Sequence, residues 1–176
     1  MAKKTFVVDQ SHSRMEFSVR HMMVAKVKGE FTKYEASIVA DPADLTDAEI
    51  EFKVDLASID TRNEDRDNHL RTGDFFDIEN HPQMTFVSKQ VVAKGDGEYD
   101  VTGDLTIRGV TRSETFEVEY EGSGKDPWGN TKVGFSVEGT INRKDYGMEY
   151  NAALETGGVL IGEKVKIAID IEAAEA

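Results

Sequence analysis

The chain has 176 residues, a length that fits one domain with its own hydrophobic core, so we expect a single domain spanning residues 1–176. Its 34 acidic and 21 basic residues give a net charge of −13. This charge disfavours nucleic acid and anionic membrane surfaces as partners, because both are bound through clustered lysine and arginine. The absence of cysteine excludes disulfides, thiolate nucleophiles and thiolate metal sites.

The first residues of the chain predict no membrane-spanning segment. Phe6, Val7 and Val8 form the longest apolar run there, far short of a signal peptide or a membrane span. We therefore expect a protein that is not an integral membrane protein. The sequence as given predicts a cytoplasmic location, or a periplasmic or extracellular one if a leader has been removed.

Apolar and polar residues alternate along most of the chain, the period of a β-strand with one buried face. A short first strand is expected at residues 5–9 and a longer one at 15–20. Between residues 27 and 38 the apolar positions change parity near Thr32-Lys33, which predicts a single coiled strand with a bulge or a sharp bend. Further strands are predicted at residues 50–56, 84–93, 99–107, 116–120, 133–141 and 165–171.

The alternation predicts antiparallel strands, because parallel strands buried on both faces read as unbroken apolar runs. Gly-rich segments separate the strands, and Gly157-Gly158 predicts a turn before the last one. Gly29, Gly103 and Gly139 at inward positions favour a strongly coiled sheet that closes on itself over a two-sheet sandwich. The predicted fold is all-β, an extended eight-stranded antiparallel up-and-down barrel, which is wide enough inside to hold one small ligand.

A densely charged segment at residues 58–82 interrupts this pattern and carries the pair Phe75-Phe76. Such dense charge cannot form core, yet adjacent phenylalanines are poor solvent-facing residues. We expect a short helical insert around residues 62–80 that places its aromatic side against the barrel.

Arg66, Asp67 and His69 within this insert suggest an alternative function. A histidine with an aspartate can act as acid and base and an arginine can hold an anion, so these residues are candidates for an enzyme acting on a lipid-like substrate. The same arginine and histidine are candidates for contact with a lipid headgroup. The structural alternative is that they hydrogen-bond to nearby carbonyl or carboxylate groups. Because no known catalytic motif is present, we assign no catalytic residue and expect a protein that is not an enzyme.

The histidines lack the spacing of a local metal chelate, so no metal site is predicted. The segment Asp9-Gln10-Ser11-His12 is expected to form a turn capped by Asp9 and Ser11.

Five ordered segments of the chain are VDQSHSRMEFSVRH, VKGEFTKYEASIVAD, SIDTRNEDRDNHLRTGDFFDIENHPQMTF, VTGDLTIRGVT and INRKDYGMEYN. Together they resemble the YceI family of lipocalin-like, polyisoprenoid-binding proteins. The resemblance spans residues 6–171 and implies a lipocalin-like barrel whose apolar tunnel takes a long isoprenoid or similar lipid, often in a dimer.

The predicted function is to bind a long apolar ligand, a polyisoprenoid or a quinone-like lipid, in the barrel interior for transport, storage or sequestration. A homodimer is expected, and no other cofactor. A barrel with a filled core that serves as an interaction module is a further alternative. The predicted tunnel lining consists of Phe17, Val19, Phe31, Phe52, Val54, Phe75, Phe76, Phe86, Leu105, Ile107, Phe135 and Ile141.

The turn at residues 142–148 offers two interpretations. Tyr146 and Met148 are candidates for a rim that meets the ligand, alongside the candidate headgroup contacts Arg66 and His69. The structural alternative is an ordinary turn in which Arg143 pairs with Asp145.

Overall fold

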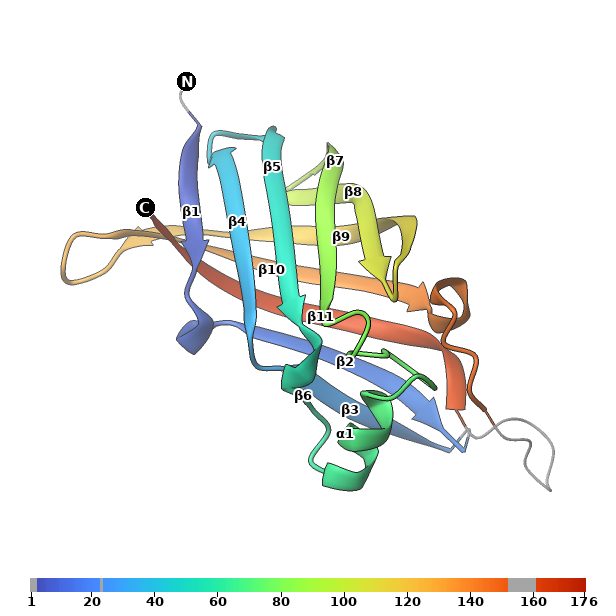
Figure 1. The fold of residues 1–176 in the computed structure, drawn as a ribbon. Helices are drawn as coiled ribbons and strands as arrows, with labels where there is room; N and C mark the ends of the chain where they lie inside the picture. The colour runs from blue at the N-terminus through green and yellow to red at the C-terminus, as the bar shows by residue number, and fades with distance from the viewer. Residues whose placement is uncertain (1–2, 23, 152–160) are drawn as a thin grey trace.

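The computed structural model describes residues 3–22, 24–151 and 161–176, and over these residues the chain is almost entirely β-structure (Figure 1). The turn predicted at Gly157-Gly158 lies outside the described residues. The strands are β1 (Lys4–Val8), β2 (Arg14–His21), β3 (Ala25–Phe31), β4 (Tyr34–Asp41), β5 (Asp44–Asp55), β6 (Ile59–Asp60), β7 (Gln83–Gly95), β8 (Glu98–Ile107), β9 (Val110–Lys125), β10 (Thr131–Asn142) and β11 (Ile161–Glu175). The helices are α1 (Glu64–Leu70) and the short 3-10 helices η1 (Gln10–His12), η2 (Leu56–Ser58) and η3 (Arg143–Tyr146).

The sheet closes into a barrel because β1 pairs with strands on both of its sides. The ring runs β1-β4-β5-β7-β8-β9-β10-β11 and returns to β1, and every pair in it is antiparallel. This confirms the predicted eight-stranded antiparallel barrel with a short helical insert. Apart from the segment at residues 27–38, each predicted strand overlaps an observed one, but several observed strands are longer than predicted: β5, β9 and β11 extend four or more residues beyond the predicted ranges.

The prediction for residues 27–38 was wrong, because this segment forms two strands, β3 and β4, and not the single coiled strand expected. The break falls at Thr32-Lys33, where the change of parity placed a bend. Its cause is a competing set of hydrogen bonds: the Thr32 amide donates to the Ser58 carbonyl oxygen at 3.3 Å, and the Asp55 amide donates to the Lys33 carbonyl oxygen at 3.0 Å. The backbone at the break is thus bonded to Ser58 of η2 and to Asp55, the last residue of β5.

Beyond the ring, β2, β3 and β6 continue the sheet from β11. β11 is long enough to pair with β1 near its C-terminal end and with β2 along its first part. The insert that contains α1 follows β6 and lies at the lower end of the barrel in the view of Figure 1.

The inward glycines make room for aromatic rings. A methyl group added at Gly29 would lie 2.5 Å from the Phe17 ring, and one added at Gly139 would collide with the Phe116 ring. The same addition at Gly103 would collide with the backbone of β7 and the Phe86 ring. Side chains therefore fill the space that these glycines leave, which lets the strands coil closely around the interior.

Among the described residues, no helix is long and apolar enough to cross a membrane.

Candidate functional site

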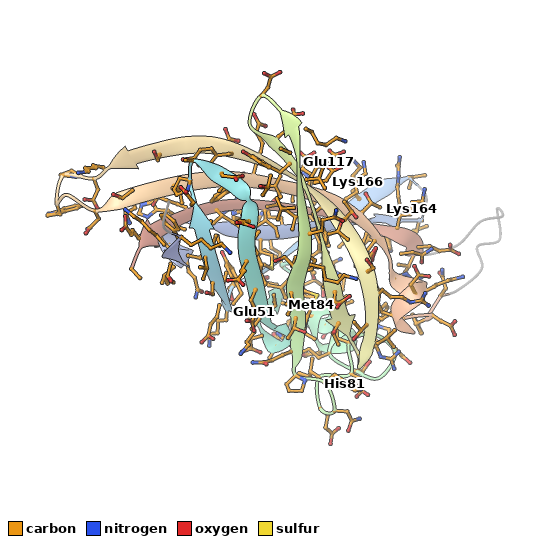
Figure 2. The ribbon with its side chains drawn as sticks, turned by 90° about the horizontal axis from the view of Figure 1, so that it is seen from above. Glu51, His81, Met84, Glu117, Lys164 and Lys166 are labelled. Carbon is orange, nitrogen blue, oxygen red and sulfur yellow. The ribbon has the colours of Figure 1, made fainter. Side chains whose placement is uncertain are left out.

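The barrel interior contains two cavities that share a wall. The inner chamber, of about 110 Å³, lies among β4, β5, β7, β8, β9, β10 and β11. The outer chamber, of about 490 Å³, is enclosed by β2, β3, the insert and the ends of β8, β10 and β11. Met84, labelled in Figure 2, and Ile167 line both chambers, so the two adjoin.

All twelve residues of the predicted tunnel lining face one of these chambers. That they contact a ligand remains a prediction. The outer chamber is lined by Phe17, Val19, Phe31, Phe75, Phe76, Ile107 and Ile141. The inner chamber is lined by Phe52, Val54, Phe86, Leu105 and Phe135.

The two chambers differ in polarity. Among the residues that line the inner chamber, Thr85 is the only non-aromatic one with a hydroxyl group. The other lining residues are aliphatic, aromatic or methionine. The outer chamber is mostly apolar on the barrel side, where Arg20, His21 and Arg143 are the exceptions, and the insert adds Asn63, Asp65, Arg66 and His69 to its wall. The interior can therefore hold an apolar chain with a polar group at the insert.

The insert is fixed to the barrel by a network around Thr61. Asp67 is buried, and its Oδ1 accepts hydrogen bonds from the Thr61 amide at 2.9 Å and the Thr61 hydroxyl at 2.5 Å. Arg66 donates from Nε to the same hydroxyl at 2.8 Å and from Nη2 to the Thr61 carbonyl at 2.6 Å. The Asn63 side chain caps α1 by accepting from the Arg66 amide at 3.0 Å.

His69 has Asp74, and not Asp67, as its carboxylate partner. The His69 Nε2 lies 2.8 Å from the Asp74 Oδ2, and the ring packs edge-to-face on Phe75 and Tyr150 with centroid distances of 5.1 Å and 4.7 Å. Asp67 is occupied with Thr61. The acid–base pair that the enzymatic alternative requires is thus not assembled, whereas the hydrogen bonds of the structural alternative are present.

The predicted aromatic side of the insert does contact the barrel. Phe75 is buried, and the Phe76 ring packs edge-to-face against Phe31 at 5.9 Å. Phe31 in turn lies 5.4 Å from Phe17 on β2. These rings form a continuous wall of the outer chamber from the sheet into the insert.

The two candidate rim residues lie in different places. Met148 is buried and lines the outer chamber. Tyr146, the other rim candidate, is completely buried, lines neither chamber, and its hydroxyl donates to the Glu114 Oε2 at 2.7 Å. Burial, followed by this hydrogen bond, raises the pKa of Tyr146. The reason is that η3 turns the ring toward β9 and away from the cavity.

Arg143 is one of several residues of the outer chamber, with Asn63, Asp65 and His21, that the sequence did not predict for the site. It does not form the turn pair with Asp145: it is buried, lines the outer chamber, and donates to three backbone carbonyls. The distances are 2.8 Å from Nε to Gly162, 2.6 Å from Nη1 to Met148 and 3.3 Å from Nη2 to Ile161. Burial lowers the pKa of Arg143. No local sequence signal distinguishes it from an exposed turn arginine, because two of its three partners, Ile161 and Gly162, belong to β11.

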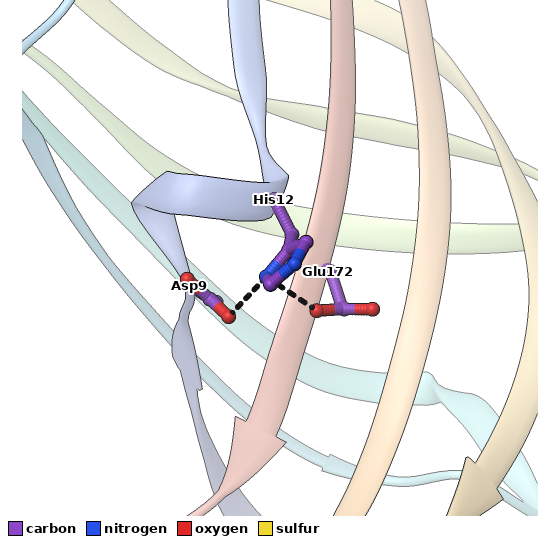
Figure 3. A group of neighbouring side chains, drawn as sticks. All are labelled: Asp9, His12 and Glu172. Carbon is purple, nitrogen blue, oxygen red and sulfur yellow. Dashed lines mark hydrogen bonds and ion pairs between the residues drawn. The ribbon is translucent and has the colours of Figure 1, made fainter. Parts of the chain in front are cut away.

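A second cluster lies outside the barrel, where Asp9 caps η1 as predicted; Ser11 lies within η1 and donates its amide and its hydroxyl to Asp9. The His12 Nδ1 lies 2.8 Å from the Asp9 Oδ2 and 3.3 Å from the Glu172 Oε2, as Figure 3 shows. The hydrogen bond with Asp9 raises the pKa of His12. The hydrogen bond from the Ser11 side chain, followed by the bond with His12, holds the pKa of Asp9 well below its usual range. The three side chains have the types that could ligate a metal ion, and the His12 Nδ1 lies within 3.3 Å of both carboxylates.

Comparison with known proteins agrees with this architecture. The YceI-like domain family model matches residues 6–173. A UPF0312 protein of Staphylococcus epidermidis is 47% identical over 168 residues, which cover 95% of each chain. A UPF0312 protein of Staphylococcus aureus is 44% identical over the same share of both chains.

Solved structures show the same barrel. The Burkholderia cenocepacia protein BcnA superposes with a TM-score of 0.83 at 25% identity, covering 94% of this chain and 98% of its own. The Campylobacter jejuni YCEI protein gives a TM-score of 0.77 at 33% identity, with 89% and 90% covered. A polyisoprenoid binding domain from Saccharophagus degradans gives 0.71 at 16% identity, with 97% and 98% covered, which bears on the fold alone. The closed barrel, its helical insert and the match along nearly the whole sequence show that this chain belongs to the YceI-like domain family.

Proposed function

We propose that this protein binds a long apolar molecule, a polyisoprenoid or a similar lipid, inside the barrel for transport, storage or sequestration. The observation that carries the proposal is the pair of adjoining chambers, apolar at the inner end and partly polar at the insert. A chain in the inner chamber would reach the outer chamber past Met84 and Ile167.

Apolar contact alone supplies enough free energy for this function. Each buried methylene group contributes about 0.8 kcal/mol, so about ten of them contribute roughly 8 kcal/mol before the costs of association. Selection would depend on the length and width of the chain, because an apolar wall offers few directional contacts. This predicts that chain length affects affinity more than the chemistry of the chain.

The polar wall of the outer chamber is the proposed place for a headgroup. Two of the three nitrogen atoms of the Arg66 guanidinium donate to Thr61, and among the described residues its Nη1 has no hydrogen-bond partner. His69 lines the same wall beside it. These two residues could hold a hydroxyl, carbonyl or phosphate group at the end of the lipid.

Polyisoprenoids are the first ligand class to test, since one structure with the same fold is described as a polyisoprenoid binding domain. Purified protein would be extracted with organic solvent, and the extract analysed for co-purified lipid by mass spectrometry. In parallel, lipid-free protein would be titrated with a long polyprenol, a long-chain quinone and farnesol. Stoichiometric binding of a long isoprenoid supports the proposal, whereas a folded protein that holds no lipid and binds none of these compounds would refute it.

An enzyme that acts on a lipid-like substrate through His69, Asp67 and Arg66 is the less favoured alternative, since the first two are not paired. For that alternative, His69→Ala should abolish turnover and leave ligand binding intact. A variant that only melts at a lower temperature would support the structural role. The filled-barrel alternative is disfavoured by the outer chamber of about 490 Å³.

The homodimer and the cytoplasmic location remain predictions. Light scattering of the purified protein would give the oligomeric state, and cell fractionation would give the location.

A further inference from the structure

The outer surface of the sheet around the outer chamber carries an unusual arrangement of charge. Side chains that alternate with the cavity lining point outward, and here they are basic. We define the basic face as the five exposed residues Arg20, Lys26, Lys28, Lys164 and Lys166, of which Arg20 also lines the outer chamber.

Strand pairing makes these five residues neighbours. Lys26 lies opposite Arg20, and Lys28 lies opposite Ser18, which lies opposite Lys166 on its other side. Figure 2 labels Lys166 and Lys164, which are two residues apart on β11. The basic face therefore extends across three adjacent strands, β3, β2 and β11.

These cations are not neutralised by the acidic groups nearby. Among the described residues, none of the five forms an ion pair. Farther along β2 and β3, the acidic side chains of Glu16 and Glu30 both form ion pairs with Arg14, at 3.2 Å and 3.5 Å. Glu163 is paired with Lys144 at 2.8 Å. On a chain of net charge −13, the cations are thus concentrated and unpaired at one place.

An apolar tip adjoins the basic face. The turn between β2 and β3 exposes Met22 and Val24, whose exposed fractions are 46% and 81%. His21, the last residue of β2, lines the outer chamber, as does the exposed Tyr150. The tip therefore stands beside the part of the chamber wall that reaches the surface.

We infer that this end of the barrel docks on an anionic lipid bilayer, with the basic face against lipid phosphates and the apolar tip inserted among the headgroups. Charge complementarity selects the partner, and exposed apolar side chains flanked by lysine and arginine are the pattern of interfacial membrane binding. The net negative charge does not prevent docking, because charges more than about 8 Å away are largely screened at physiological ionic strength. Resting on the proposed function, this docking would let a lipid pass between bilayer and outer chamber without crossing water.

The test uses vesicles that contain no isoprenoid, so that it does not depend on ligand binding. The protein should co-sediment with vesicles of phosphatidylglycerol and phosphatidylcholine in equal parts and not with vesicles of phosphatidylcholine alone. Since one lysine near an anionic surface contributes about a fivefold factor, Lys28→Glu with Lys166→Glu should weaken binding at least about twentyfold. Val24→Ser should weaken it independently.

The matched control is Lys33→Glu with Lys125→Glu, which makes the same change in net charge at two exposed lysines outside the basic face. This control should bind anionic vesicles like the unaltered protein. Four results would each overturn the inference. The first two are equal binding to both kinds of vesicle and no binding to either kind. The other two are preferential binding to duplex DNA over anionic vesicles and an equal loss of vesicle binding in both double variants. Titration of the same variants with a long polyprenol in solution tests the proposed function separately. The affinity of the variants for the polyprenol should equal that of the unaltered protein.

Discussion

Blocking the junction between the chambers gives the sharpest test of how deeply a ligand enters. Ile167 lines both chambers, and its neighbour Ala168 is exposed on the outer face of the same strand. Ile167→Trp should place a large ring across the junction and exclude the ligand from the inner chamber. Ala168→Trp adds the same side chain outside the barrel and serves as the control.

The size of the effect follows from the inner chamber, whose volume is about 110 Å³. At ~30 Å³ per group, the volume share of one water molecule in the liquid, the chamber holds about four methylene-sized groups. Losing the burial of about four methylenes costs about 3 kcal/mol, which weakens binding roughly a hundredfold. A short isoprenoid such as farnesol, which the outer chamber can hold alone, should lose much less affinity.

The assay is titration of each variant with a long polyprenol and with farnesol, followed by intrinsic fluorescence or calorimetry, with circular dichroism to establish folding. If Ile167→Trp fails to fold, Met84→Trp tests the same junction from β7. A folded junction variant that binds the long polyprenol with unchanged affinity would refute the reasoning, because the chain would then not pass through the junction.

Three further predictions concern stability. Arg143→Met removes the side-chain donor from the Gly162 and Met148 carbonyls and one of two side-chain donors from the Ile161 carbonyl, and should lower the free energy of unfolding by about 2–4 kcal/mol, measured by urea denaturation; no loss would contradict the buried network. Gly139→Ala should lower the free energy of unfolding by about 1–3 kcal/mol, because the new methyl group collides with Phe116. Gly134→Ala on the same strand, where the nearest atom would lie at 3.4 Å from the methyl group, should lower it much less. Equal losses in the two variants would count against the explanation. The pKa of His12 is raised above 6.5, so its ion pairs stabilise the folded state fully below pH 6.5 and are lost as pH rises through the raised value. His12→Gln should therefore lower the melting temperature at pH 6 and have little effect at high pH, and a difference independent of pH would contradict this.

The barrel was predictable because its determinants are local. In a sheet with one buried face, side chains alternate between interior and exterior, so the apolar parity of each strand identifies the lining without knowledge of its neighbours. For this reason Phe52 and Leu105, distant in sequence, could both be assigned to the interior and are found in the wall of the same chamber. The aromatic pair of the insert, Phe75-Phe76, could be assigned to a contact with the barrel on the same grounds.

Features that depend on contacts between distant segments were not predictable. The parity change near Thr32 indicated where the chain bends, but only the hydrogen bonds to the chain around η2 divide it into two strands. Burial of Arg143 requires carbonyls from Met148, Ile161 and Gly162 to meet in space. Neither condition leaves a trace in the period of apolar residues.

By itself, the sequence determined the all-β class, the strands, the inward face of each strand and the family, because alternation and ordered motifs are properties of the chain. Tertiary structure alone decided that the interior forms two adjoining chambers, that His69 pairs with Asp74, and that cations gather on one face of an acidic protein. The physical reason is that closure of the barrel and strand register set the distances between residues far apart in the chain. Net charge and motif spacing contain no information about those distances.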